Sequence, residues 1–163
     1  MLKRVINAVR RNHALEHATI SILLSRHGPM RVVGRAVPDG FYIYGDIPTE
    51  RLRELADEAL TRLQRGEADL AVSPLCGTNI AVAGVLAGLG SYVALGAGPR
   101  RAGGVSGAIM AAMLAVLAAQ PLGRLIQKYY TTSPDLGGVR IVSVLPMRRR
   151  LFRGHKVRTA GAA

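Results

Sequence analysis

The sequence predicts an α+β protein: a small cytoplasmic domain of order αββαβ–β with an inserted two-helix transmembrane hairpin. Two observations predict this class. Two long runs without charged residues follow one another in the middle of the chain. The sequence around them alternates between helical spacing of apolar residues and short strand-like segments at Gly and Pro turns. At 163 residues the chain is long enough for one domain with a buried core and an appendage.

The two uncharged runs predict the transmembrane helices. The first includes Ile80–Ala97, which is about as long as a hydrocarbon core is thick at a rise of roughly 1.5 Å per residue. The second, Ala102–Gly123, follows Arg100 and Arg101. Small residues on one face of each helix predict close packing of the pair and a homo-oligomer through the same faces; these are Gly84, Gly88, Gly103, Gly107, Ala108, Ala111, Ala112 and Ala115. A buried helical hairpin in a soluble core is the alternative.

The distribution of positive charge predicts the topology. Eleven Lys and Arg residues precede Ile80, two lie between the runs and nine follow Gly123. The positive-inside rule therefore predicts a multi-pass protein of the bacterial inner membrane with both termini in the cytoplasm. The net charge of +12 then suits a bilayer with anionic headgroups rather than nucleic acid. Tyr129 and Tyr130 are expected at the membrane interface.

The remaining sequence predicts the cytoplasmic domain from residues 1–78 and 127–158, with the hairpin at 79–126 and a disordered tail at 159–163. A first helix, 2–26, should end at Gly28. Strands at 31–37 and 41–45 flank the turn at Asp39 and Gly40. A second helix runs from Pro48 to Gly66. Further strands are expected at 69–73 and 139–145.

Three titratable residues of the first helix lie among its apolar residues. At about 100° per residue, His13, Glu16 and His17 share the arc of Val5 and Ile20. Burial without partners would be costly, so these groups must be satisfied by one another, by other polar groups or by a metal. His13 and His17 lie one turn apart and could bind one zinc ion, with Glu16 beside them to accept a proton from water.

The segment HALEH, residues 13–17, resembles the HxxEH signature of the pitrilysin and insulysin zinc peptidases. The resemblance implies that His13 and His17 are ligands, that Glu16 is the general base and that a downstream Glu completes the site. The acids of the second helix are expected on its solvated face; they are Glu50, Glu54, Asp57 and Glu58. The remaining ligand therefore stays open among Glu67, Asp69, Cys76 and His155.

The segment SPLCGTN, residues 73–79, is the second place with chemical potential. Cys76 is the only cysteine, which excludes an intramolecular disulfide, and its thiolate could bind zinc. A small buried side chain at the start of a span is the alternative. The segments RNHALEHATI, GEADLAVSPLCGTN and HKVRT resemble an uncharacterised bacterial membrane family, a domain of unknown function. That family has histidine where this chain has Ser73.

Three functions fit these observations. The first is a membrane-anchored, metal-dependent hydrolase of peptidase type, with zinc on His13, His17 and Cys76 and with Glu16 as base. The second is a non-catalytic integral membrane protein in which the same cluster is a structural metal or hydrogen-bond site. The third is an assembly protein that packs through its Gly/Ala hairpin. The sequence contains no Gly-rich nucleotide loop.

Overall fold

The computed structural model describes residues 1–96, 104–149 and 152–162, and it divides into two compact units. Met1–Ser73 and Lys128–Ala163 form the first, here called the α+β unit. Pro74–Gln127 form the second, the helical hairpin. Arg100, Arg101 and Gly103, which the sequence assigns to the hairpin, lie outside the described residues.

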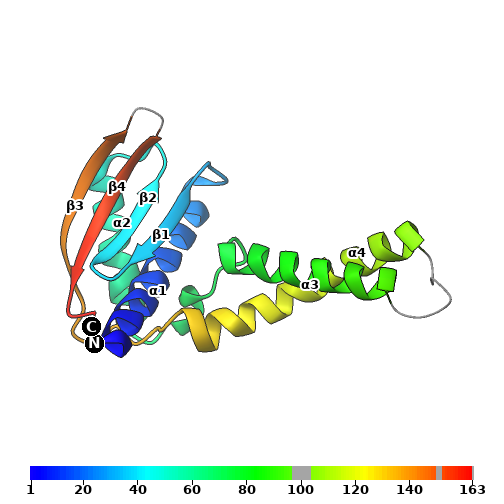
Figure 1. The fold of residues 1–163 in the computed structure, drawn as a ribbon. Coiled ribbons are helices and arrows are strands. Elements are labelled where there is room, and N and C mark those ends of the chain that lie inside the picture. The colour runs from blue at the N-terminus through cyan, green and yellow to red at the C-terminus, as the bar shows by residue number, and fades with distance from the viewer. Residues whose placement is uncertain (97–103, 150–151, 163) are drawn as a thin grey trace. The chain divides into compact units, whose positions relative to one another are not determined.

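The α+β unit contains two long helices, a short 3₁₀ turn and four strands (Figure 1). In chain order these are α1 (Leu2–His27), β1 (Val33–Val37), β2 (Gly40–Tyr44), α2 (Thr49–Gln64), η1 (Ala68–Ala71), β3 (Arg140–Arg149) and β4 (Phe152–Ala160). The predicted mixed class is confirmed. The first helix ends as predicted at Gly28, whose φ of 76° favours glycine.

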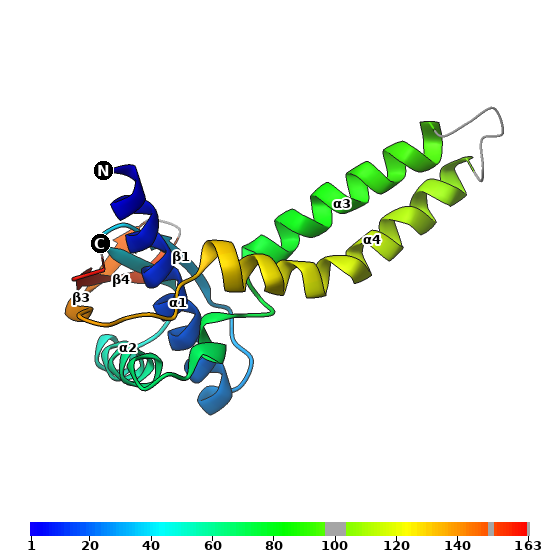
Figure 2. The ribbon, with the colours of Figure 1, turned by 90° about the horizontal axis from the view of Figure 1, so that it is seen from below.

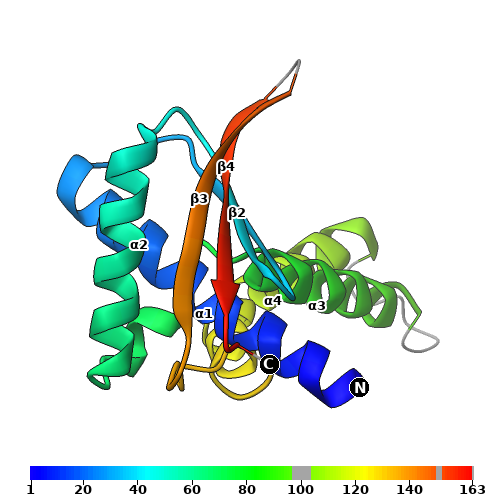
Figure 3. The ribbon, with the colours of Figure 1, turned by 90° about the vertical axis from the view of Figure 1, so that its left-hand side faces the viewer.

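The four strands form one antiparallel sheet of order β1-β2-β4-β3. Both helices pack on one face of this sheet, and a single core joins them to it (Figure 3). Alternation along the strands turns Phe41, Ile43 and Val157 into that core, while Tyr42 and Lys156 face away from it. The fully buried large side chains of the helices include Leu15, Leu23, Leu52 and Leu55.

The structure corrects the sequence predictions for this unit in three places. The segment predicted as a strand at 69–73 begins as η1, because its amides bond backward to nearby carbonyls, as from Leu70 to Glu67. The strand predicted at 139–145 is confirmed as β3, although β3 extends further, and its partner β4 was missed. The residues of β4 that face away from the core include Lys156 and Arg158. Because these side chains are charged, the segment was read as a basic stretch and its strand-like alternation was not recognised. The first two residues of the predicted tail belong to β4, and Thr159 donates to the Asn12 side chain at 2.7 Å.

The helical hairpin consists of α3 (Gly77–Gly96) and α4 (Gly104–Ile126), which run side by side (Figure 2). A π-helical turn, η2 (Gln127–Thr131), continues α4. Both helices are long and apolar enough to cross a membrane, as predicted. Only 6% of the apolar window of α3 and 11% of that of α4–η2 are buried, which contrasts with a helix in a soluble core. The outward side chains are large and apolar; they include Leu89, Tyr92, Val93, Ile109 and Leu117.

The contact between α3 and α4 uses small residues, but only some of those predicted. Ser91 donates to the Ala108 carbonyl at 3.2 Å, and Gly90 lies against Ala111. Gly84 and Gly88 have open space where a Cβ would project, so this predicted pair does not line the contact. The physical reason is that residues spaced by four follow one face of α3, and the face that meets α4 is a different one.

A buried polar cluster joins the start of α3 to the end of α4. Asn79 donates to the Pro74 carbonyl at 2.9 Å and accepts from the Gln127 amide at 2.8 Å. Gly123 packs directly on Asn79, and a Cβ on residue 123 would overlap the Asn79 amide oxygen. Because amide groups in an apolar setting must be satisfied, Gly123 is the residue that permits this arrangement.

Gly123→Ala is therefore expected to displace the Asn79 side chain and to lower the stability of the hairpin by about 1–3 kcal/mol. Gly84→Ala is the matched control. It adds a methyl group in open space and should be neutral or slightly stabilising, because alanine is the better helix former. Thermal unfolding in detergent, followed by helical circular dichroism, compares the two variants. Equal midpoints would contradict the proposed role of Gly123.

His155 is the buried histidine of β4. Its Nε2 atom lies 2.9 Å from the Thr49 hydroxyl at the start of α2, and its Nδ1 atom is buried without a hydrogen-bond partner among the described residues. Burial lowers the pKa of His155 below its ordinary value of 6.5, and the Glu50 carboxylate opposes this shift only weakly. The folded state therefore favours the neutral ring.

A histidine with a lowered pKa contributes stability above its unfolded pKa and loses it as the pH falls. We expect the α+β unit to unfold more easily at pH 5.5 than at pH 7.5, because the unfolded chain takes up the proton first. His155→Gln should flatten this part of the dependence, since glutamine does not titrate in this range. Chemical unfolding at both pH values measures the difference. An unchanged slope in His155→Gln would contradict the assignment.

Candidate functional site

The middle of α1 is buried on all sides. An amphipathic helix normally buries one stripe, but residues 14–20 are all buried here. The sheet, α2 and η1 all contact this helix, which explains the wide burial. The polar residues within or beside this segment are Asn12, Glu16, His17 and Thr19, none more than 5% exposed. The burial predicted for Glu16 and His17 is thus confirmed, and His13 is half-buried.

His13 and His17 are neighbours with fixed ring orientations. Their ring centroids are 4.2 Å apart, with the ring planes at 58°. The Nδ1 atom of His17 lies 2.8 Å from the Ala71 carbonyl oxygen in η1. The Nδ1 atom of His13 lies 3.0 Å from the Thr131 carbonyl oxygen in η2. Each ring is therefore held by a backbone acceptor from a different part of the α+β unit.

These two hydrogen bonds determine the tautomer of each ring. A carbonyl oxygen only accepts, so each Nδ1 must carry the proton and donate it. In the neutral imidazole the remaining lone pair is then on Nε2. Metal-binding histidines use the same arrangement, in which one ring nitrogen donates to a carbonyl or carboxylate and the other binds the metal. Both rings therefore have the Nδ1 hydrogen bond that is common among metal-binding histidines.

Glu16 occupies a space that glycine provides. Its side chain lies against Gly34 of β1, and a Cβ on residue 34 would overlap the Oε1, Cδ and Cγ atoms of Glu16. Glycine in a strand often marks such a close approach. Sequence reasoning missed Gly34, although an isolated glycine inside the predicted strand 31–37 was the signal that could have found it.

Two further residues position this part of α1, and sequence reasoning missed both. Arg10 donates to the carbonyl oxygens of Tyr129 at 2.9 Å and Thr132 at 3.0 Å, so it holds the segment that carries the acceptor of His13. Asn12 donates to the Val37 carbonyl at 2.9 Å and accepts from Thr159. Asn12 therefore ties α1 to the β1–β2 turn and to the end of β4.

Cys76 belongs to the helical hairpin, where it precedes α3. It is 7% exposed, and its sulfur accepts the amide proton of Thr78 at 3.4 Å. The sulfur thus satisfies one of the backbone amides at the start of α3. This agrees with the alternative in which Cys76 is a small buried side chain at the start of the helix. Ser73 is the buried last residue before the hairpin.

The other ligands left open by the sequence have different surroundings. Glu67 accepts from the Arg62 guanidinium at 2.8 Å, and this contact lowers the pKa of Glu67. His155 pairs with Thr49 as described above, and Asp69 is exposed in η1. The acids of α2 face outward as predicted, where Asp57 and Glu58 form ion pairs with Arg53 and Arg26.

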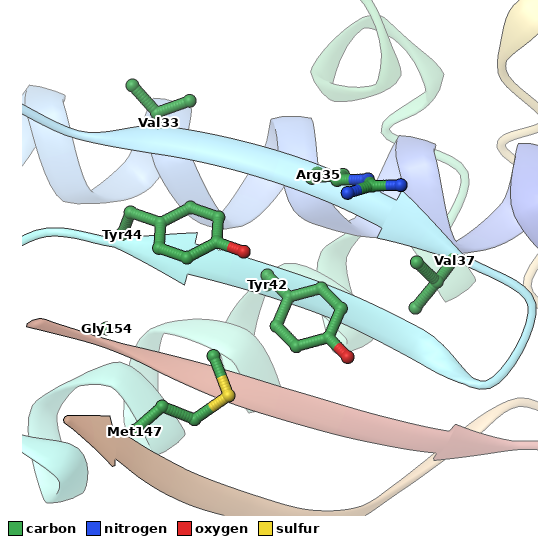
Figure 4. Close-up of a pocket in the computed structure, with 7 residues that line it drawn as sticks. All are labelled: Val33, Arg35, Val37, Tyr42, Tyr44, Met147 and Gly154. Carbon is green, nitrogen blue, oxygen red and sulfur yellow. The ribbon is translucent and has the colours of Figure 1, made fainter. Parts of the chain in front are cut away.

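The outer face of the sheet contains a separate hollow of about 610 Å³ (Figure 4). Tyr42 and Tyr44 form its floor, with ring centroids 6.1 Å apart and planes at 13°. The other lining residues are Val33, Arg35, Val37, Met147 and Gly154. This lining contains neither a metal ligand of the His, Cys or carboxylate type nor a general base, so the hollow does not offer the chemistry of the α1 cluster.

Comparison with known proteins identifies the family to which this chain belongs. Residues 8–144 match the domain of unknown function DUF6391. An uncharacterised protein of the cyanobacterium Picosynechococcus sp. is 33% identical over 138 residues, which cover 78% of this chain and 67% of the relative. No solved structure shows a significant match. The match spans most of the chain and includes both the HALEH helix and the CGTN segment, and the chain therefore belongs to the DUF6391 family.

Proposed function

We propose that this protein is a membrane-anchored, zinc-dependent hydrolase of peptidase type whose metal ligands include His13 and His17. One observation carries the proposal: both histidines donate through Nδ1 to backbone carbonyls, which is how histidines that bind a metal through Nε2 are commonly oriented. A chain that only needed to satisfy two buried rings would not have to present both through the same nitrogen. Their spacing of one helical turn suits a single ion.

Cys76 is proposed as the third ligand. Its thiolate is a common zinc ligand alongside histidine nitrogens, and Cys76 is the only cysteine in the sequence. Nitrogen and thiolate donors together favour zinc among the abundant divalent metals. The alternatives Glu67 and His155 are instead hydrogen-bonded to Arg62 and Thr49.

The proposed chemistry follows from the donor set. His13, His17 and Cys76 would hold the zinc ion, which would supply Lewis-acid chemistry to a carbonyl group of the substrate. Glu16 is adjacent to His17 in sequence and is held by the space at Gly34. As general base, Glu16 would accept the proton of the attacking water and deliver it to the leaving amine. Peptide or amide bonds are the expected substrates.

A second candidate is a non-catalytic structural site. The observation that favours it is the burial of Glu16 and His17, which are only 5% and 3% exposed. In this candidate, Glu16 supports the site through hydrogen bonds, and the metal or hydrogen-bond cluster holds α1 to the rest of the protein. The distinction between the two candidates therefore rests on whether Glu16 transfers protons or only accepts hydrogen bonds.

The membrane anchor is the other part of the proposal. The apolar α3 and α4 are proposed to span the bacterial inner membrane, with both termini in the cytoplasm as the charge distribution indicates. Tyr129 and Tyr130, which are 60% and 75% exposed, directly follow the second span. Amphipathic tyrosine rings favour the headgroup region, so their place agrees with this topology.

Zinc content tests the site. We expect about one zinc ion per chain in protein purified without chelators, and we expect the metal to be lost in His13→Ala and His17→Ala. His27→Ala is the matched control, because His27 is exposed at the end of the same helix and should leave the metal unchanged. Elemental analysis of all variants gives the result. A wild type that is metal-free but fully stable would contradict the proposal.

Glu16→Gln separates the two candidates. A general base lost in this way should abolish hydrolysis of a fluorogenic peptide library while zinc content and folding stay unchanged. A supporting hydrogen-bond acceptor should instead show a loss of about 10–100-fold in zinc affinity. Hydrolysis and competitive zinc titration are measured on the same preparations. Full hydrolysis by Glu16→Gln would exclude the catalytic role of Glu16.

The control for this experiment uses Gly34. Gly34→Ala should destabilise the α+β unit because its methyl group overlaps Glu16. The cost should largely disappear in a Glu16→Ala background, where the space is empty. If both backgrounds respond equally, the carboxylate does not occupy the space at Gly34, and a change in Glu16→Gln must have another origin.

A further inference from the structure

The first turns of α1 present an exposed apolar stripe. Leu2, Val5 and Ile6 are 73%, 40% and 47% exposed, and residues 1–7 make up an entirely exposed stretch. Spacings of three and four residues place these side chains on one face of the helix. Figure 3 shows that this end of α1 projects away from the strands. The stripe therefore lacks a covering element within the described part of the α+β unit.

Positive charge surrounds this stripe. The stripe's own turns carry Lys3 and Arg4; Arg10 and Arg11 follow but are bonded to backbone carbonyls and to Asp135, and Glu16 is the first acidic residue of the chain. An apolar stripe bordered by cations and without acids is typical of a helix that lies in a membrane interface. Its charge complements anionic headgroups, to which each nearby Lys or Arg contributes about 1 kcal/mol of attraction.

Hydrogen bonds fix this end of α1 beside the residues that follow α4. Arg10 donates to the Tyr129 and Thr132 carbonyls at 2.9 and 3.0 Å, and the Ser133 amide donates to the Arg10 carbonyl at 3.0 Å. Tyr129 lies three residues beyond Ile126, the last residue of α4. If α4 spans the bilayer, Tyr129 is at headgroup level, and the α1 turn bonded to it is at nearly the same level.

We propose that residues 2–9 of α1, called the surface segment, lie in the headgroup region of the membrane that holds the hairpin. Leu2, Val5 and Ile6 would enter the boundary of the acyl chains, while Lys3 and Arg4 contact lipid phosphates. The proposal rests on the membrane anchoring proposed above. It also locates the His13 site, which is seven residues from Ile6 and so about 10 Å further along the helix, close to the bilayer surface.

The absence of tryptophan from the chain allows a direct test. Single-tryptophan variants of the full chain are reconstituted in vesicles of phosphatidylcholine and phosphatidylglycerol, with or without dibrominated lipid, which quenches tryptophan on contact. Ile6→Trp reports on the surface segment. Glu54→Trp, on the exposed face of α2, is the control outside the membrane, and Leu117→Trp, exposed on α4, is the control within it.

We expect Ile6→Trp to be quenched severalfold more than Glu54→Trp and to emit at shorter wavelength. Adding Lys3→Glu and Arg4→Glu to Ile6→Trp should reduce this quenching, because the charges then repel phosphatidylglycerol. All three substituted side chains are exposed, so folding should be kept.

Quenching of Leu117→Trp without quenching of Ile6→Trp would overturn the surface segment and leave the membrane anchor intact. Short-wavelength emission of Ile6→Trp without quenching would also overturn it, because a second protein copy would then cover the stripe. If Leu117→Trp is not quenched and alkaline carbonate extracts the protein from membranes, the anchor itself is wrong.

Discussion

The burial of ionisable side chains in the middle of α1 is the constraint on which the rest of the α+β unit depends. His17 is fully enclosed and can be tolerated only because the Ala71 carbonyl meets its ring. That requirement explains why the chain turns into η1 at this point, since a turn directs a carbonyl sideways where a paired strand would use it in the sheet. The Thr131 carbonyl is the corresponding acceptor for His13, and it comes from the segment that follows the hairpin in the sequence.

Local patterns predicted most elements, because helical spacing and turn residues act over a few positions. The burial of Glu16 and His17 also followed from their angular place on the first helix. The hydrogen-bond partners of the histidines could not be predicted in this way. His13 and Thr131 are 118 positions apart, and a carbonyl acceptor has no signature in the sequence. Gly34 and Asn12 belong to the same class. Their roles depend on which side chain the fold brings opposite them, and only the tertiary structure decides that.

In the hairpin, composition predicted the spans but not their contact. Gly84 and Gly88 matched the spacing of a close-packing pair, yet the contact runs through Gly90 and Gly123 instead. Long apolar helices offer small residues on several faces, so spacing alone does not choose among them. The choice follows from Asn79, because a buried amide must be satisfied and fixes the rotation of α3 against α4.

The insertion of the hairpin divides the sheet between two distant parts of the chain. Strands β1 and β2 come from the segment before the hairpin, whereas β4, which pairs with β2 in the interior of the sheet, is synthesised after the hairpin. Until β4 arrives, β2 has an open hydrogen-bonding edge and the core around Phe41 lacks Val157. The apolar hairpin must therefore leave the ribosome, and find its environment, before the domain that flanks it can close. If the hairpin did not reach its environment, the open edge of β2 could pair with other chains and cause aggregation. Correct folding of the α+β unit therefore depends on where the hairpin goes during translation.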